Sequence, residues 1–202
     1  MKRLFDIVFS ILGLLFFLPL FLVIMILIKI EDHGPTIYQG LRVGYRNKRF
    51  KMYKFRTMVV NAEKLGGSNT SNIDKRITKI GKELRKTKLD ELPQLINVLK
   101  GDMSFVGPRP EVEFYVNMFT EEEKSILTVK PGITDWATLW DHDEGALLSK
   151  YDDPDKAYLD IIRPMKLKLQ LEYVKKHNLF IDLRIIWLTM RTIFSKKQIK
   201  LP

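Results

Sequence analysis

The longest apolar segment of the chain lies near its N-terminus. Residues 7–28 form an uncharged run of 22 residues, in which only Ser10, Gly13 and Pro19 are not strongly apolar. At about 1.5 Å per residue, a straight helix of this length would cross a hydrocarbon core of about 30 Å. The run is too long for the core of a signal peptide, and no small-residue cleavage site follows it. The pattern therefore predicts a helix that associates with a membrane.

Pro19 lies near the middle of this run and leaves two topologies open. Proline removes one backbone hydrogen bond, so a kinked hairpin with two short arms competes with a straight span. Lys2 and Arg3 precede the run, and five basic residues follow it between positions 29 and 49. The positive-inside rule draws both flanks to the cytoplasmic side, and a straight helix would satisfy it at one end only. On charge and Pro19 alone, the two topologies are evenly balanced.

The rest of the chain predicts a small hairpin and several helices. Alternating apolar and polar positions indicate strands at residues 36–43 and 49–55, joined by a turn at residues 45–48. Helical periodicity follows at residues 92–99, at residues 120–127 with Thr120 and Glu123 as a capping box, at residues 155–173 with Pro164 inside, and at residues 179–194. The expected fold class is α/β and mostly helical, with a small β-hairpin.

The last of these helices has two interpretations. Its apolar residues are interleaved with Arg184 and Arg191, which is typical of an amphipathic helix. Core packing and binding to a membrane surface are equally compatible with this pattern. Trp187 and the basic flanks favour the membrane interface.

Length and composition narrow the classes of protein. With 202 residues, 46% of them hydrophobic, the chain is long enough for one domain with a core and an appendage. A net charge of +10 predicts attraction to an anionic partner, which could be nucleic acid, anionic lipid or a phosphorylated substrate. The absence of cysteine excludes disulfides and thiolate metal sites.

Two adjacent carboxylates, Asp90 and Glu91, precede the helical pattern at residues 92–99. Pro93 is tolerated in a first helical turn, so we expect Asp90 to be the N-cap and Glu91 the first helical residue. A helix N-terminus suits phosphate and keeps a nearby carboxylate ionised, and an ionised aspartate can act as a nucleophile. For an Asp-Glu pair on its own, simple helix capping is the commoner role.

Several basic residues are candidates for contacts with phosphate. Arg56 and Arg85 could form bidentate hydrogen bonds to phosphate oxygens. Arg109 lies between Pro108 and Pro110, which fix the backbone and would present its side chain from a stiff loop. The acidic run at residues 141–144 is a poor candidate for a metal site, because consecutive residues rarely converge on one ion.

Four motifs together resemble one family. They are Lys-Phe-Arg-Thr-Met at residues 54–58, the segment 87–102 around Asp90, the segment 101–111 with Gly-Pro-Arg-Pro, and Lys-Pro-Gly-Ile-Thr at residues 130–134. In this order and spacing they resemble the bacterial sugar transferases known as monotopic phosphoglycosyl transferases, and the resemblance runs from about Lys2 to about Phe194.

The resemblance implies an architecture and a location. Residues 1–35 would form a re-entrant membrane helix with its break at Leu18 and Pro19. Residues 36–202 would form a cytoplasmic catalytic domain with amphipathic interfacial helices. The protein would lie at the inner (cytoplasmic) membrane of a bacterium, with its active site facing the cytoplasm.

The resemblance also implies a reaction and its residues. A sugar 1-phosphate, from an N-acetylated or diamino-deoxy hexose, would pass from a UDP-sugar to polyprenol (undecaprenyl) phosphate, with release of UMP. Asp90 would form an aspartyl-phosphosugar, and Asp90 and Glu91 would hold Mg²⁺. The substrate-binding residues would be Lys54, Arg56, Arg85, Pro108, Arg109, Pro110 and His142.

The sequence departs from the commonest family pattern at Leu18, at Asp135 and over residues 140–142, where many relatives have an Asn-Gly-Arg run. Leu18 stands where many relatives have serine, so a hydroxyl at the helix break is missing. Asp135 replaces a glycine, and His142 replaces an arginine whose contact with phosphate or sugar is therefore not carried over. A histidine at this position can still donate one hydrogen bond.

Two other functions are compatible with parts of the sequence. A non-enzymatic basic module that binds a membrane surface would explain the charge and the apolar elements, but not the Asp-Glu pair. A metal-dependent nucleotide-sugar hydrolase would use the same carboxylates. Nucleic acid is not an expected partner, because aromatic residues are not interleaved with basic ones as in single-strand-binding motifs.

Overall fold

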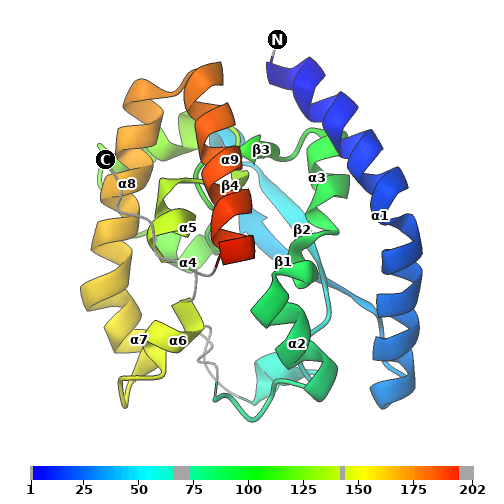
Figure 1. The fold of residues 1–202 in the computed structure, drawn as a ribbon. Helices are drawn as coiled ribbons and strands as arrows, with labels where there is room; N and C mark the ends of the chain where they lie inside the picture. The colour runs from blue at the N-terminus through cyan, green and yellow to red at the C-terminus, as the bar shows by residue number, and fades with distance from the viewer. Residues whose placement is uncertain (1, 66–72, 142–143, 196–202) are drawn as a thin grey trace.

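The computed structural model describes residues 2–65, 73–141 and 144–195. Figure 1 shows a long N-terminal helix along one side of the molecule, with shorter helices around two small sheets. The helices are α1 (Lys2–Asp32), α2 (Lys79–Thr87), α3 (Gln94–Lys100), α4 (Glu113–Val116), α5 (Trp136–Trp140), α6 (Glu144–Leu148), α7 (Pro154–Ala157), α8 (Arg163–Lys176) and α9 (Leu179–Ser195). The strands are β1 (Ile37–Val43), β2 (Arg49–Phe55), β3 (Ser104–Val106) and β4 (Gly132–Thr134). A mostly helical fold with a small hairpin is confirmed.

The hairpin of β1 and β2 is the larger sheet. The alternating pattern predicted the two strands around a turn. They pair antiparallel, with Ile37 opposite Phe55 and Val43 opposite Arg49. The connecting turn contains two residues with left-handed backbone, Arg46 and Asn47. A second sheet, the parallel pair β3 and β4, was not predicted, because strands of three residues are too short to show a period.

Helix α1 is continuous across Leu18 and Pro19. Figure 1 shows that it changes direction about midway, which is where the proline lies. Proline removes one hydrogen bond and bends a helix without necessarily ending it. The break expected at Leu18 and Pro19 is therefore a bend within one helix. Among the described residues, α1 is the one helix long and apolar enough to cross a membrane.

The first turn of α1 is bonded to the rest of the molecule through polar side chains. Lys2 Nζ donates to Val106 O at 2.8 Å and pairs with the Asp182 carboxylate at 2.6 Å. Arg3 donates to the last carbonyl groups of α3, with 2.6 Å to Val98 O. Asp6 is buried and accepts from Ser104 Oγ at 3.0 Å.

The last turn of α1 is bonded to the same body. Asp32 pairs with Arg56, which follows β2, and Glu31 accepts from the backbone N–H of Lys79 at the start of α2. Between the two ends, Phe21 and Ile24 are buried in an apolar cluster with Phe55 and Leu84, while an outer face that includes Leu15 and Phe16 stays exposed. The apolar helix thus lies along the domain and is fixed at both ends.

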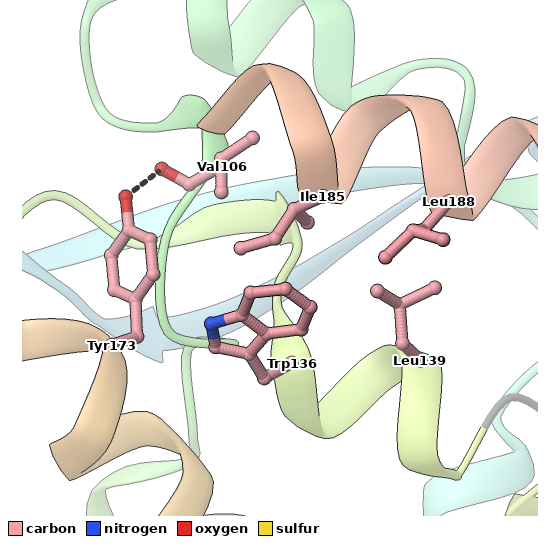
Figure 2. Close-up of a cluster of buried hydrophobic side chains, with 6 residues drawn as sticks. All are labelled: Val106, Trp136, Leu139, Tyr173, Ile185 and Leu188. Atoms are coloured by element: carbon pink, nitrogen blue, oxygen red, sulfur yellow. Dashed lines mark hydrogen bonds between the residues drawn. The ribbon is translucent and has the colours of Figure 1, made fainter. Parts of the chain in front are cut away.

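Helix α9 has two apolar faces. On the inner face, Ile185 and Leu188 pack into a buried cluster with Val106, Trp136, Leu139 and Tyr173 (Figure 2), where the Tyr173 hydroxyl donates to Val106 O at 3.2 Å. On the outer face, Phe180, Trp187 and Met190 are exposed. The predicted helix at residues 179–194 is confirmed, and it contributes to the core while keeping apolar surface outside.

Two other predicted helices differ in detail. Residues 120–127 were expected to form a short helix, and the structure has a 3₁₀ helix at Glu123–Thr128. The predicted capping box is present, because Glu123 accepts from the N–H of Thr120 at 2.7 Å and Thr120 accepts from the N–H of Glu123 at 3.3 Å. The segment 155–173 divides into α7, a π-helical turn Tyr158–Ile162, and α8, whose first turn contains Pro164.

Candidate active site

The carboxylate pair lies in a tight turn that links two helices. Lys88 ends α2 with left-handed backbone (φ 59°), and Leu89–Glu91 follow as a 3₁₀ turn. Helix α3 begins only at Gln94, with Pro93 as its N-cap, so the expectation that Asp90 caps the helix is wrong. The periodic apolar positions at residues 92–99 do not show where α3 begins, because the same pattern fits a 3₁₀ turn followed by an α-helix.

Asp90 is a buried carboxylate that keeps one oxygen free. Its exposed fraction is 6%, and among the described residues Oδ1 has no hydrogen-bond partner. Burial raises the pKa of Asp90, while the charge of Lys54 acts in the opposite direction. Cationic side chains, and not a helix N-terminus as predicted, are therefore what favours the ionised form of Asp90.

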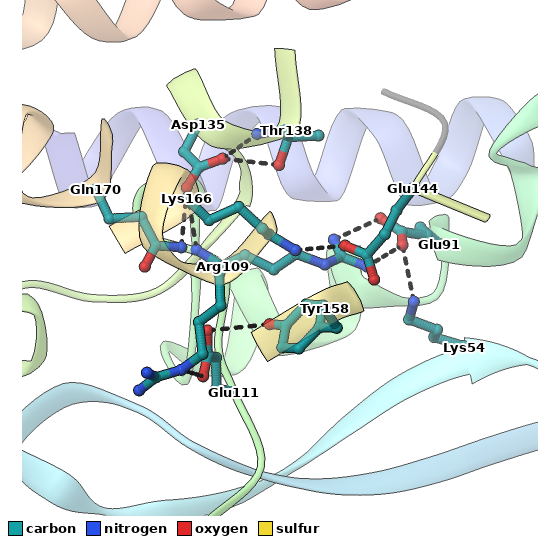
Figure 3. A network of polar contacts seen from close by, with 11 residues as sticks. Lys54, Glu91, Arg109, Glu111, Asp135, Thr138, Glu144, Tyr158, Lys166 and Gln170 are labelled. Carbon is teal, nitrogen blue, oxygen red and sulfur yellow. Dashed lines mark hydrogen bonds and ion pairs between the residues drawn. The ribbon is translucent and has the colours of Figure 1, made fainter. Parts of the chain in front are cut away.

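Glu91 is held between two cationic side chains (Figure 3). Lys54 Nζ from β2 lies 2.8 Å from Oε1, and the Arg109 guanidinium bridges both carboxylate oxygens at 2.5 and 3.2 Å. Burial opposes the ionisation of Glu91, but Arg109 and Lys54 together hold its pKa well below the ordinary range. Three residues from distant motifs, Lys54, Glu91 and Arg109, thus meet in one place, and their contacts with substrate or metal stay predictions.

Arg85 and Arg56 have different surroundings. Arg85 Nε donates to Thr57 Oγ1 at 2.9 Å, and both Asp90 and Glu91 act electrostatically on its guanidinium. The three guanidinium nitrogens of Arg56 bond instead to Asp32 and to Pro35 O, at the end of α1. Arg56 therefore anchors the apolar helix, and its contact with phosphate stays a prediction. His142 lies outside the described residues.

The Pro-Arg-Pro loop is held by close backbone packing. Pro108 and Pro110 are buried, and the N–H of Gly132 donates to Pro108 O at 3.1 Å. A Cβ atom on Gly132 would lie 2.1 Å from the nitrogen of Gly107, so only glycine fits at this contact. The two prolines and this packing fix the backbone from which Arg109 extends.

Asp135 holds the same loop through a hydrogen bond to the backbone of Arg109. It is fully buried and accepts from the N–H of Arg109 at 3.3 Å, from the N–H and hydroxyl of Thr138 at 2.6 and 2.7 Å, and from Gln170 Nε2 at 3.3 Å. The sequence marked Asp135 only as a departure from glycine. Its role as an anchor for the loop depends on tertiary contacts.

A second ion pair, Glu144 with Lys166, was missed from the sequence. Lys166 is buried on α8 and bonds to Glu144 at the start of α6. Figure 3 shows the ends of the Glu91, Arg109, Glu144 and Lys166 side chains gathered in one place. Sequence reasoning considered Glu144 only within an acidic run, and no local pattern links it to a lysine 22 positions later.

The residues present fit a Mg²⁺ ion that shares its coordination with a substrate. Among the described residues, no group of three or more His, Cys, Asp or Glu side chains could hold a metal by itself. Mg²⁺ is commonly bound by one or two carboxylates together with substrate phosphates. The free Oδ1 of Asp90 matches this kind of site, and Glu91, whose two oxygens are bonded to Lys54 and Arg109, is its neighbour in the chain.

The geometry defines a class of site. A buried carboxylate with a free oxygen, three cationic side chains around it, and a long apolar helix fixed to the same domain are together suited to a phosphorylated substrate beside a membrane. The sequence model of the bacterial sugar transferases matches residues 1–196, so the chain belongs to the bacterial sugar transferase family.

Three relatives illustrate this family. The UDP-N-acetylgalactosamine-undecaprenyl-phosphate N-acetylgalactosaminephosphotransferase of Aeromonas hydrophila is 38% identical, over 96% of this chain and 44% of its own length. The undecaprenyl-phosphate glucose phosphotransferase of Komagataeibacter xylinus is 36% identical, over 96% and 36%. The exopolysaccharide production protein ExoY of Rhizobium meliloti is 33% identical, over 95% and 84%. The chain spans less than half the length of the first two.

Proposed function

We propose that this protein transfers a sugar 1-phosphate from a UDP-sugar to polyprenol phosphate, releasing UMP. The observation that carries the proposal is the buried Asp90 with a free Oδ1, next to a Glu91 that Lys54 and Arg109 hold as an anion. The names of two relatives, which specify undecaprenyl phosphate as acceptor, support the same assignment.

Asp90 is the proposed nucleophile. Its carboxylate oxygen attacks the β-phosphorus of the donor and forms a new P–O bond. The bond from this phosphorus to the bridging oxygen breaks, UMP leaves with that oxygen, and an aspartyl-phosphosugar remains. A phosphate oxygen of the lipid then attacks the same phosphorus and frees the carboxylate. Two displacements on a covalent intermediate keep the two anionic substrates from having to meet directly.

Cationic side chains stabilise the phosphates in this proposal. Lys54, Arg85 and Arg109 lie around the carboxylate pair, where they can balance the charge that develops on the transferring group. Pro108 and Pro110 hold Arg109 in place. Mg²⁺, when bound by Asp90 and Glu91, would neutralise charge on the diphosphate and on the leaving UMP.

The attachment of α1 supports a re-entrant topology. Lys2 and Arg3 at one end, and Glu31 and Asp32 at the other, all bond to the same domain. A helix that spans a membrane would place its ends on opposite sides, and one folded domain lies on one side only. We therefore propose that α1 enters the cytoplasmic membrane of a bacterium and returns at the bend, with both ends and the active site facing the cytoplasm.

The outer surface of the molecule is compatible with this placement. The exposed apolar faces of α1 and α9 can enter lipid, and Trp187 is of the residue type that favours a membrane interface. The proposed location follows from the chemistry as well, since the acceptor is a lipid and the donor is soluble in water.

Release of UMP tests the proposed reaction. The full chain in lipid nanodiscs is incubated with a panel of UDP-sugars, Mg²⁺ and undecaprenyl phosphate, beside Asp90→Asn and the control Asp160→Asn, which replaces an exposed aspartate. We expect UMP from wild type and the control only. Equal release by wild type and Asp90→Asn would eliminate the transferase, and free sugar phosphate formed without lipid acceptor would identify a hydrolase.

A further inference from the structure

Gln94, the first residue of α3, is a buried amide without a partner. Its exposed fraction is 0%, and among the described residues neither Nε2 nor Oε1 has a hydrogen-bond partner. Leaving both ends of an amide unpaired in the interior is unfavourable, and buried glutamines are normally hydrogen-bonded. The side chain is therefore a candidate for contact with a ligand.

The position of Gln94 in the chain places it next to the carboxylate pair. It follows Glu91 by three residues and Asp90 by four, which is one helical turn, and Leu92 and Pro93 between them have helical backbone angles. Side chains at these spacings lie on the same side of a helix. The amide of Gln94 thus belongs to the side of the turn that carries Asp90.

The next amide along α3 shows how such a side chain is normally satisfied. Asn97 is equally buried, but it accepts from the N–H of Tyr53 at 2.9 Å and donates to Lys51 O at 2.7 Å, both on β2. Asn97 therefore has a structural role that its contacts explain. Gln94, one turn nearer to the carboxylates, makes no such contact among the described residues.

Two free polar groups thus lie one turn apart, the amide of Gln94 and Oδ1 of Asp90. They do not hydrogen-bond to each other, so each remains available to a third group. A phosphoryl group attached to Asp90 would offer acceptor oxygens beside the Nε2 donor. An uncharged amide can donate a hydrogen bond here, whereas a glutamate would repel the phosphate.

We propose that Gln94 contacts the transferring phosphoryl group, with Nε2 donating a hydrogen bond to a phosphoryl oxygen while the phosphosugar is bound to Asp90. The proposal rests on the proposed function, because it requires a phosphoryl group at Asp90. It adds a catalytic residue whose contribution is greatest when charge develops on that oxygen.

The experiment compares wild type with Gln94→Met, which keeps length and removes both polar atoms, and with Gln94→Glu, which removes the donor. Gln39→Met, at an exposed glutamine of β1, is the matched control. The full chain in nanodiscs is mixed with an active UDP-sugar and Mg²⁺, and the rate of UMP release and the mass of the covalent adduct are measured. Steady-state kcat, KM and the melting temperature are measured in parallel.

We expect Gln94→Met to form the adduct about 10 to 100 times more slowly, the range for one hydrogen bond to a charged group. Its KM for the donor should change by less than about 3-fold and its melting temperature should not fall, because an unpaired amide is replaced by an apolar side chain. Gln94→Glu should be slower still, and Gln39→Met should match wild type.

Three outcomes would overturn the role of Gln94. They are a wild-type rate in Gln94→Met or Gln94→Glu, a loss of activity in Gln94→Met that accompanies a lower melting temperature, and failure of both variants to fold. The last two would assign the amide a structural role. If wild type itself neither releases UMP nor gains an adduct, the proposed function fails first, and the two failures are thereby distinguished.

Discussion

Substitutions of the two adjacent carboxylates are expected to change stability in opposite directions. Asp90 is buried with one oxygen unpaired, so Asp90→Asn removes a desolvated charge and should raise the free energy of unfolding at neutral pH by about 1 kcal/mol. Glu91→Gln breaks ion pairs with Lys54 and Arg109. Loss of one partner from a buried pair costs about 3–5 kcal/mol. Because the Glu91 and Arg109 side chains are 14% and 27% exposed, we expect about 2–3 kcal/mol here.

The pH dependence of the two effects follows from the directions of the pKa shifts. Burial raises the pKa of Asp90, so its contribution to stability is present in acid and is lost as the pH rises through the raised pKa. The advantage of Asp90→Asn should therefore shrink as the pH falls. Burial acts to raise the pKa of Glu91, but pairing with Arg109 and Lys54 outweighs burial and lowers it. The contribution of Glu91 to stability is therefore present at neutral pH and is lost only as the pH falls through the lowered pKa.

Thermal unfolding followed by tryptophan fluorescence, in one detergent at several pH values, measures both effects. For a chain of this length, 1 kcal/mol corresponds to about 2–4 °C in melting temperature. At pH 7 we expect Asp90→Asn to melt higher and Glu91→Gln to melt lower than wild type. Shifts of the same sign in both variants would refute the assignment of one unpaired and one paired carboxylate.

Three further substitutions test other parts of the structure. Arg109→Lys keeps the charge but loses the two-point contact with Glu91, so we expect kcat to fall about 100-fold or more. The control is Arg49→Lys, in an ion pair with Glu113 whose side chains are 59% and 44% exposed. It should change neither activity nor melting temperature. Gly132→Ala should lower the free energy of unfolding by about 1–3 kcal/mol or more, because the added Cβ would lie 2.1 Å from the nitrogen of Gly107. An unchanged midpoint of urea unfolding would contradict this. Lys2→Met leaves the buried Asp182 without its cation and should lower the melting temperature by several degrees, and a wild-type value would show that the first turn of α1 is not anchored there.

Local features of the fold could be predicted from the sequence, and features that depend on distant contacts could not. The hairpin and α9 follow from periodic patterns that extend over seven or more residues. The start of α3 was placed wrongly. A proline can occupy either the first turn of a helix or the N-cap position just before it, and Pro93 is the N-cap. The parallel pair β3 and β4 is too short for any period to be detected.

The same distinction applies to the candidate site. Asp90, Glu91, Lys54 and Arg109 were predicted because they belong to motifs of adjacent residues, and the structure brings the last three together. Arg56 was predicted for the site, but its side chain bonds to Asp32, a residue on an element that the motif does not include. The burial of the Gln94 amide, and the partners of Asp135 and Lys166 far along the chain, are not revealed by a single sequence.

Hydrogen bonds from Arg3 to the end of α3 connect the apolar helix α1 to the segment that carries the carboxylate pair. One end of α3 is bonded to the first turn of α1 through Arg3, and its other end begins four residues after Asp90, the proposed nucleophile. Where α1 enters the bilayer as proposed, a change in bilayer thickness would act on its first turn and be passed through Arg3 to α3 and to the turn that carries Asp90. Turnover in this protein should therefore depend on the acyl-chain length of the surrounding lipid, even when every substrate is supplied in excess.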